Sequence, residues 1–243
     1  MPPPLLQFDG EPFFSSMPLD GSLVFIGASG KRSDPKETVK LALEDAALRV
    51  AMFYQVYGEY ALENFTGSGA FDFTYNTHTV LRTDVEGSKQ YVEVLQFNAD
   101  TDTFEYENTF FIRATYPVSL PSPVNYRPAY RGADRKPDWI ENPPHEIDGY
   151  EAVVSFSARY SSMAVAYNNS RNNAVFAIIR NNNTVSQANN LLYQETSSIF
   201  GYKTANNDVT YSYGILYGFY VLDSWINPAD KTVWTLAIAK KSI

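Results

Sequence analysis

The chain has 243 residues, which allows one large domain or two of ordinary size, and its 44% hydrophobic content is enough for a substantial core. The 15% aromatic content favours β structure. A net charge of −8 argues against binding to nucleic-acid phosphates, and the absence of cysteine excludes disulfides, thiolate metal sites and cysteine nucleophiles.

Residues 1–21 are rich in proline and predict an extended, irregular segment. They lack a basic region followed by an apolar one, so we expect that an export signal has been removed from this chain. Residues 22–29, SLVFIGAS, form a short apolar run between Gly21 and Gly30 and predict a buried strand.

The stretch from Ser33 to Tyr57 predicts an amphipathic helix. Asp34 can cap its start, Pro35 suits the first helical position, and Glu37 completes a spacing like that of a capping box. Apolar residues recur at intervals of three and four, which places them along one side: Val39, Leu43, Ala46, Val50, Phe53 and Tyr57.

The rest of the first half predicts strands. Residues 71–76 alternate aromatic and polar residues, residues 90–97 resume the strand pattern, and residues 104–116 predict a long strand after a turn at 98–102. The first half is therefore expected to be a strand, a helix and an antiparallel meander.

Residues 117–144 hold seven of the 14 prolines, which indicates a linker or an extended strap. Tyr126, Tyr130 and Trp139 favour a packed strap over a free tether.

The second half predicts the same order again: a strand at 151–158, a helix at 163–180, a long aromatic strand at 210–225 and a final strand at 232–239. An offset of about 128 residues places Phe25 over Val153 and Ala46 over Ala174. We therefore expect an α+β protein of two similar units, each with one long helix packed on an antiparallel β-meander. The units are residues 1–116 and 145–243, and the proline-rich strap at 117–144 joins them.

Two segments carry a family resemblance. Pro137-Asp138-Trp139-Ile140 precedes a strand and a helix, and residues 25–29 and 41–47 supply a similar strand and an Ala-rich helix. This arrangement resembles the lipoprotein-20 family of bacterial envelope lipoproteins. The first unit lacks the matching Trp, and the second helix departs from the Ala-rich pattern. The resemblance implies a protein of the periplasm or outer membrane with no established enzymatic chemistry, which meets the membrane only through a lipid anchor absent from this chain.

Candidate catalytic and metal-binding groups are sparse. The histidines, His78 and His145, lie in different halves; His145 with Glu146 and Asp148 could form an oxygen-rich cation site, but a solvated loop explains this segment better. Asp100-Thr101-Asp102 lacks the rest of a calcium loop and suits a hairpin turn. We therefore expect no catalytic residues, metal or cofactor.

These observations predict a non-catalytic envelope module that binds another envelope protein or assembles with itself. Aromatic residues suit such a contact, and the candidates are Trp139, Tyr217, Tyr220 and Trp225. The alternative is a periplasmic or secreted protein that binds a small ligand or carbohydrate in a cleft between helix and sheet, with Glu105 or Asp223 as hydrogen-bonding groups.

Overall fold

The structure is a computed structural model, and it describes residues 7–8, 11–12, 16, 21–67, 72–132, 134–158, 162–182, 184–193 and 203–240. It is a mixed α+β protein, as predicted. The first half contains β3 (Leu23–Gly30), α1 (Pro35–Tyr54), β4 (Val56–Gly67), β5 (Asp72–Arg82), α2 (Val85–Val92), β6 (Thr103–Tyr106) and β7 (Thr109–Tyr116).

The second half contains β11 (Tyr150–Ser157), α3 (Met163–Asn182), β12 (Thr184–Tyr193), β13 (Lys203–Leu216), β14 (Tyr220–Ile226) and β15 (Val233–Lys240). Short elements make up the rest: β1 (Gln7–Phe8), β2 (Glu11–Pro12), β8 (Tyr130–Arg131), β9 (Lys136–Pro137), the 3-10 helix η1 (Asp138–Ile140) and β10 (Glu146–Ile147).

Helix α1 begins and ends close to its predicted limits. The side chain of Asp34 accepts a hydrogen bond from the backbone N–H of Lys36 at 2.9 Å, and Pro35 occupies the first helical position. Ala46, Val50 and Phe53 are buried on the side that faces the core. Helix α3 also matches its prediction, and among the described residues no helix is both long and apolar enough to cross a bilayer.

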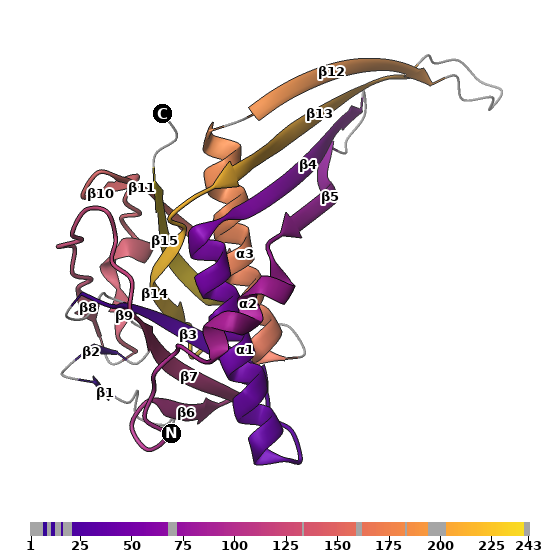
Figure 1. The fold of residues 1–243 in the computed structure, drawn as a ribbon. Helices are drawn as coiled ribbons and strands as arrows, with labels where there is room; N and C mark the ends of the chain where they lie inside the picture. Colours follow the sequence, from indigo (N-terminus) through magenta and orange to yellow (C-terminus); the bar gives the residue numbers. More distant parts are fainter. Residues whose placement is uncertain are drawn as a thin grey trace.

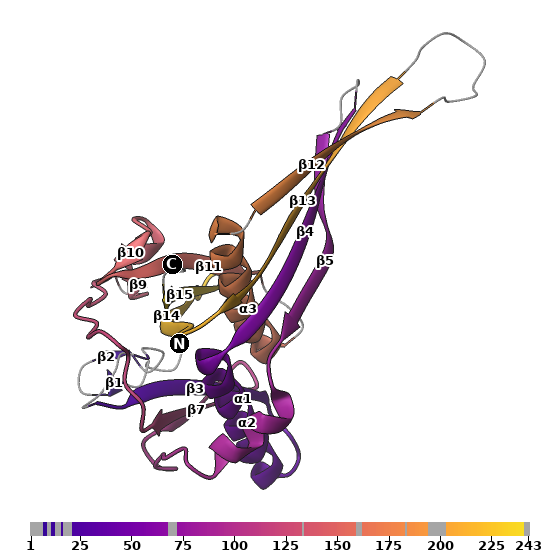
Figure 2. The same cartoon turned by 45° about the horizontal axis from the view of Figure 1, so that its top comes forward.

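Three sheets organise these elements. Two lie in the body, with strand orders β3-β7-β6 and β10-β11-β15-β14, and the third has the order β12-β13-β4-β5. In each body sheet the first long strand of its half pairs with the last one, so neither is a simple meander. The third sheet consists of two long hairpins that leave the body together (Figures 1 and 2).

Three predicted elements are wrong. Most of residues 90–97 belong to α2 and the turn after it, because Asp84 caps that helix by accepting from the N–H of Gly87 at 2.7 Å. The strand expected at 104–116 is the hairpin β6–β7, which turns at Glu107 (φ 48°) and Asn108 (φ 59°). The strand expected at 210–225 is divided at Gly218 (φ 67°) into β13 and β14, which lie in different sheets.

Helix α1 lies very close to β3 at a glycine. A Cβ atom on Gly27 would stand 1.9 Å from the carbonyl oxygen of Ala42, so only glycine permits this approach. In the second half, Ser155 on β11 donates a hydrogen bond to the carbonyl oxygen of Ser170 on α3 at 2.6 Å. Helix and sheet therefore meet closely at one such position in each half.

The proline-rich segment packs on the body as a strap, anchored at a buried carboxylate. Asp223 on β14 accepts hydrogen bonds from Trp139 Nε1 and from the Tyr130 hydroxyl, both at 2.9 Å. Asp223 and Trp139 are both 0% exposed. The strap is thus part of the core.

Candidate assembly surface

The two halves of the chain meet in the hairpin sheet, where β13 pairs with β4. This antiparallel pairing covers twelve residue pairs, from Ala205 opposite Gly67 to Leu216 opposite Val56. It joins the second strand of one hairpin to the first strand of the other. Two hairpins far apart in sequence therefore form one continuous sheet, visible in Figures 1 and 2.

Beneath this sheet, a buried ion cluster holds α1 to α3. Asp45 on α1 accepts from Arg49 Nη2 at 2.8 Å and from Arg171 Nη2, on α3, at 2.6 Å. Arg171 also donates from Nη1 to the carbonyl oxygen of Ile26 on β3 at 2.6 Å. Burial alone would raise the pKa of Asp45, but the charges of Arg171 and Arg49 and their hydrogen bonds hold that pKa below its ordinary value of 3.8.

The asparagines of α3 complete this cluster. Asn172 Oδ1 accepts from Arg49 Nη1 at 3.2 Å, and Asn168 Oδ1 accepts from both arginines. Asparagine is a poor helix former, and these contacts explain its use at positions 168 and 172 of α3. The sequence signal was present, because Arg171 interrupts the apolar side of the predicted helix, but sequence alone did not reveal its partner.

The hairpin sheet ends in two strands that have a neighbour on one side only. The order β12-β13-β4-β5 leaves the outer edges of β12 and β5 without a paired strand among the described residues. An unpaired strand edge presents backbone N–H and C=O groups in a row and is a template for another strand. These edges are therefore candidate contact sites.

Next to β12, an open groove of about 520 Å³ runs between α3 and β11. Val154 and Phe156 on β11 and Asn173 and Arg180 on α3 are among its lining residues. Phe156 is 55% exposed, and its ring lies 5.0 Å from that of Trp234. The groove thus offers an apolar floor with a basic residue at its rim.

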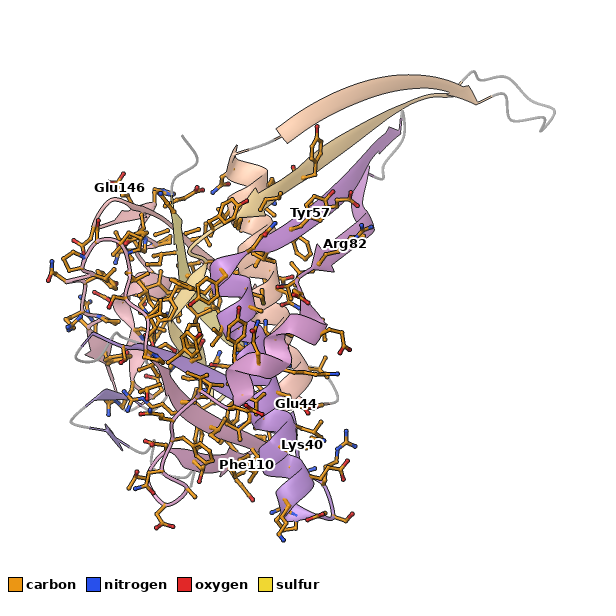
Figure 3. The ribbon with its side chains drawn as sticks, in the orientation of Figure 1. Lys40, Glu44, Tyr57, Arg82, Phe110 and Glu146 are labelled. Atoms are coloured by element: carbon orange, nitrogen blue, oxygen red, sulfur yellow. The ribbon has the colours of Figure 1, made fainter. Side chains whose placement is uncertain are left out.

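A second open surface lies next to β5, at the other edge of the hairpin sheet. A depression of about 390 Å³ lies among α1, α2 and the base of β5, with Tyr54, Tyr57, Arg82, Asp84 and Tyr91 in its lining. The rings of Tyr54 and Tyr91 stack with centroids 5.7 Å apart. Figure 3 shows Tyr57 and Arg82 on the same side of the molecule as two exposed-face residues of α1, Lys40 and Glu44.

The four aromatic candidates do not form a surface row. Trp139, Tyr220 and Trp225 are core residues, 0%, 2% and 7% exposed, whereas Tyr217 is 54% exposed. Trp225 donates from Nε1 to the carbonyl oxygen of Asp134 at 3.0 Å, so it helps to hold the strap. Only Tyr217 has the exposure that a partner contact requires.

The other groups named from the sequence have structural partners or lie outside the described side chains. Asp148 accepts backbone N–H groups of Asn125 and Tyr126, and Asp102 accepts the N–H of Asn98, as a turn requires. Glu105 pairs with Lys31 at 2.7 Å. His145 and Glu146 are exposed, and the side chain of His78 is outside the described residues.

The described residues contain no group of three or more acidic or histidine side chains suited to a metal ion. The small-ligand alternative needs a cleft between helix and sheet. The cavity beside β3, of about 20 Å³, has room for one water molecule, whereas the groove between α3 and β11 is open. The small-ligand function remains a prediction.

No family model, curated protein or solved structure matches this chain. The resemblance to the lipoprotein-20 family therefore remains a prediction, and the functional argument depends on the geometry above.

Proposed function

We propose that this protein is a non-catalytic structural module that assembles with copies of itself by repeating, between chains, the pairing of β13 with β4. That pairing is the single observation that carries the proposal. It is a head-to-tail contact, because unlike strands of two hairpins meet, and such a contact leaves unlike edges at the two ends. The outer edge of β5 on one copy would then pair with the outer edge of β12 on the next copy.

Similarity between the two halves supports this geometry. Both halves contain a strand, a helix, a hairpin and two further strands in that order, with α2 added after the hairpin of the first half. In both, the first strand pairs with the last. An offset of about 128 residues puts Gly27 over Ser155 and Ala42 over Ser170. These are the residues that meet at the helix–sheet contact of each half. We therefore treat residues 21–116 and 145–240 as two copies of one unit.

The same offset assigns an occupant to the groove beside α3. Inside the chain, α3 covers Ile26, Ala28 and Asp45 of the first unit. The equivalent residues of the second unit are Val154, Phe156 and Asn173, and these line the groove. In an assembly, the surface around α1 and α2 of the next copy would fill it.

A disulfide experiment tests the direction of assembly, because the native chain has no cysteine. Val209 lies opposite Glu63 in the internal pairing, and the equivalent of Glu63 is Leu191 on β12. The equivalent of Val209 is Val80 on β5, because Val80 faces Glu59 in its hairpin as Val209 faces Gln187, the equivalent of Glu59, in the other. Directly opposed residues in antiparallel strands are within disulfide range. We expect the double variant V80C/L191C to give a ladder of covalent multimers under mild oxidation.

The matched controls are the single variants V80C and L191C. A head-to-tail contact never brings two equivalent positions together, so neither should form a covalent dimer. Dimers of V80C alone would indicate a two-fold contact and overturn the proposed geometry. A native chain that remains a monomer in light scattering at its highest soluble concentration would overturn self-assembly. The cell-envelope location is part of the proposal and is supported by the sequence resemblance alone.

A further inference from the structure

The register of the hairpin sheet sorts residue types between its two faces. Paired residues in neighbouring strands share a face, and successive residues along a strand alternate. Beyond the row of Tyr60, whose ring packs on Phe176 of α3, the aromatic positions of the sheet fall on one face: Phe65, Phe73, Tyr75, Tyr193 and Tyr211. Val185, Leu191, Ala205 and Val209 share this aromatic face with the polar residues His78, Gln187, Asn189, Lys203 and Asn207.

Hydroxyl residues occupy the opposite face. Beyond the row of Tyr60, every serine or threonine with a register partner falls there: Thr66, Thr74, Ser186, Thr204 and Thr210. Asn64, Asn76, Asn190, Asn206, Asp72 and Asp208 share this hydroxyl face with the apolar residues Leu62, Ala188 and Leu192. A sheet that stands in water on both sides has no reason to segregate residues in this way, so the two faces meet different surroundings.

We infer that the aromatic face of the hairpin sheet contacts the hydrocarbon of a lipid bilayer while the hydroxyl face remains in water. The four strands have 12, 11, 10 and 14 residues. A strand of about 9 to 11 residues matches the hydrocarbon thickness of a bilayer. The sheet also projects away from the body in both views, where a flat surface could reach it (Figures 1 and 2).

The ends of the aromatic face fit the polar boundaries of a bilayer. Tyr213 and Ile215 lie on this face near the body and are 58% and 44% exposed, so the body does not cover it. Phe65, Phe73 and Tyr193 lie toward the far end. Aromatic residues at both ends of an apolar band are typical of proteins that meet both interfaces of a bilayer.

This inference rests on the proposed self-assembly, because backbone groups at an open strand edge are costly in hydrocarbon. Neighbouring copies would pair the edges of β5 and β12. Glu63 also lies on the aromatic face, opposite Val209 and Tyr75. A charged carboxylate opposes entry into hydrocarbon, so Glu63→Gln should increase the fraction of protein bound to vesicles.

Flotation with phosphatidylcholine vesicles tests the inference with two adjacent residues of β13. Val209→Asp places a charge on the aromatic face and should reduce the floating fraction at least about tenfold, since such a charge costs several kcal/mol in hydrocarbon. Thr210→Asp places the same charge on the hydroxyl face and should float like the native chain. Equal behaviour of the two variants would overturn the inference.

Tryptophan reporters keep the test decisive if Val209→Asp also weakens assembly. Phe65→Trp should shift its emission to the blue with vesicles and be quenched by brominated acyl chains, whereas Asn64→Trp, one residue away on the other face, should do neither. Native oligomers that fail to float would overturn the lipid contact and leave self-assembly standing. A native chain that is monomeric by light scattering would instead contradict the proposed function.

Discussion

Arg171 on α3 donates a hydrogen bond from Nη1 to the carbonyl oxygen of Ile26 on β3 at 2.6 Å, across 145 residues of sequence. Its Nη2 binds Asp45, and its side chain is 2% exposed. One buried guanidinium therefore joins α3 of the second half to the sheet and the helix of the first.

Replacement of Arg171 by Met should lower the free energy of unfolding by about 3 to 5 kcal/mol, because it leaves a buried carboxylate with one cation fewer. Urea unfolding measures the change. The control is Lys40→Ala, which removes an exposed ion pair with Glu44 and should cost about 0 to 1 kcal/mol. Similar losses in the two variants would contradict the structural role of Arg171.

Stability should fall in acid because of Asp45. Its pKa is lower in the folded protein than the ordinary value of 3.8, so the folded state gains stability from the charged carboxylate above that pH. This contribution is lost as the pH falls below about 4 and the carboxylate is protonated. Unfolding measured from pH 7 to pH 3 should show a smaller pH dependence in Asp45→Asn than in the native chain. Parallel stability curves for the two proteins would show that groups other than Asp45 cause the loss of stability at low pH.

Gly27→Ala should destabilise the fold by about 1 to 3 kcal/mol or more, because the added methyl would overlap the backbone of α1. The matched control is Gly30→Ala at the end of the same strand, where a Cβ would have no atom within 4 Å. Thermal unfolding compares them directly. A tolerated Gly27→Ala would mean that α1 does not lie this close to β3.

Asp223→Ala should release the strap, because it removes the acceptor of both Trp139 and Tyr130 and leaves a buried indole N–H unpaired. Limited trypsin digestion should then cut faster after Arg131 and Arg135, which are not followed by proline. Tyr130→Phe keeps the indole bond and serves as the milder comparison. Unchanged cleavage in Asp223→Ala would show that other contacts hold the strap.

Capping residues, prolines and apolar runs in the sequence predicted the helix and the strand whose ends these residues define. Asp34 and Pro35 define the start of α1, and the apolar run at residues 22–29 predicts β3. The strand prediction at residues 90–97 took no account of Asp84, whose side chain caps α2. Gly218 carries the turn that divides the aromatic stretch, and its positive φ was visible only in the structure.

Contacts between distant segments could not be predicted in the same way. Pairing of β13 with β4 depends on backbone hydrogen bonds, which any two extended segments can form, so residue types give little information about the partner. The cluster of Asp45, Arg49 and Arg171 was likewise hidden, because Arg171 and Asp45 are 126 residues apart in the sequence. The candidate assembly surface was therefore absent from the sequence interpretation, although self-assembly was among its hypotheses.

The pairing of β13 with β4 has a consequence for how the protein is made. A ribosome that has released β4 must add roughly 150 more residues before β13 is complete, which takes about 10 to 30 s at ordinary elongation rates. During that interval the inner edge of β4 is exposed on the nascent chain, and other nascent chains can reach it. A low concentration of nascent chains therefore favours pairing of β4 with its own β13 over pairing with a strand of another molecule.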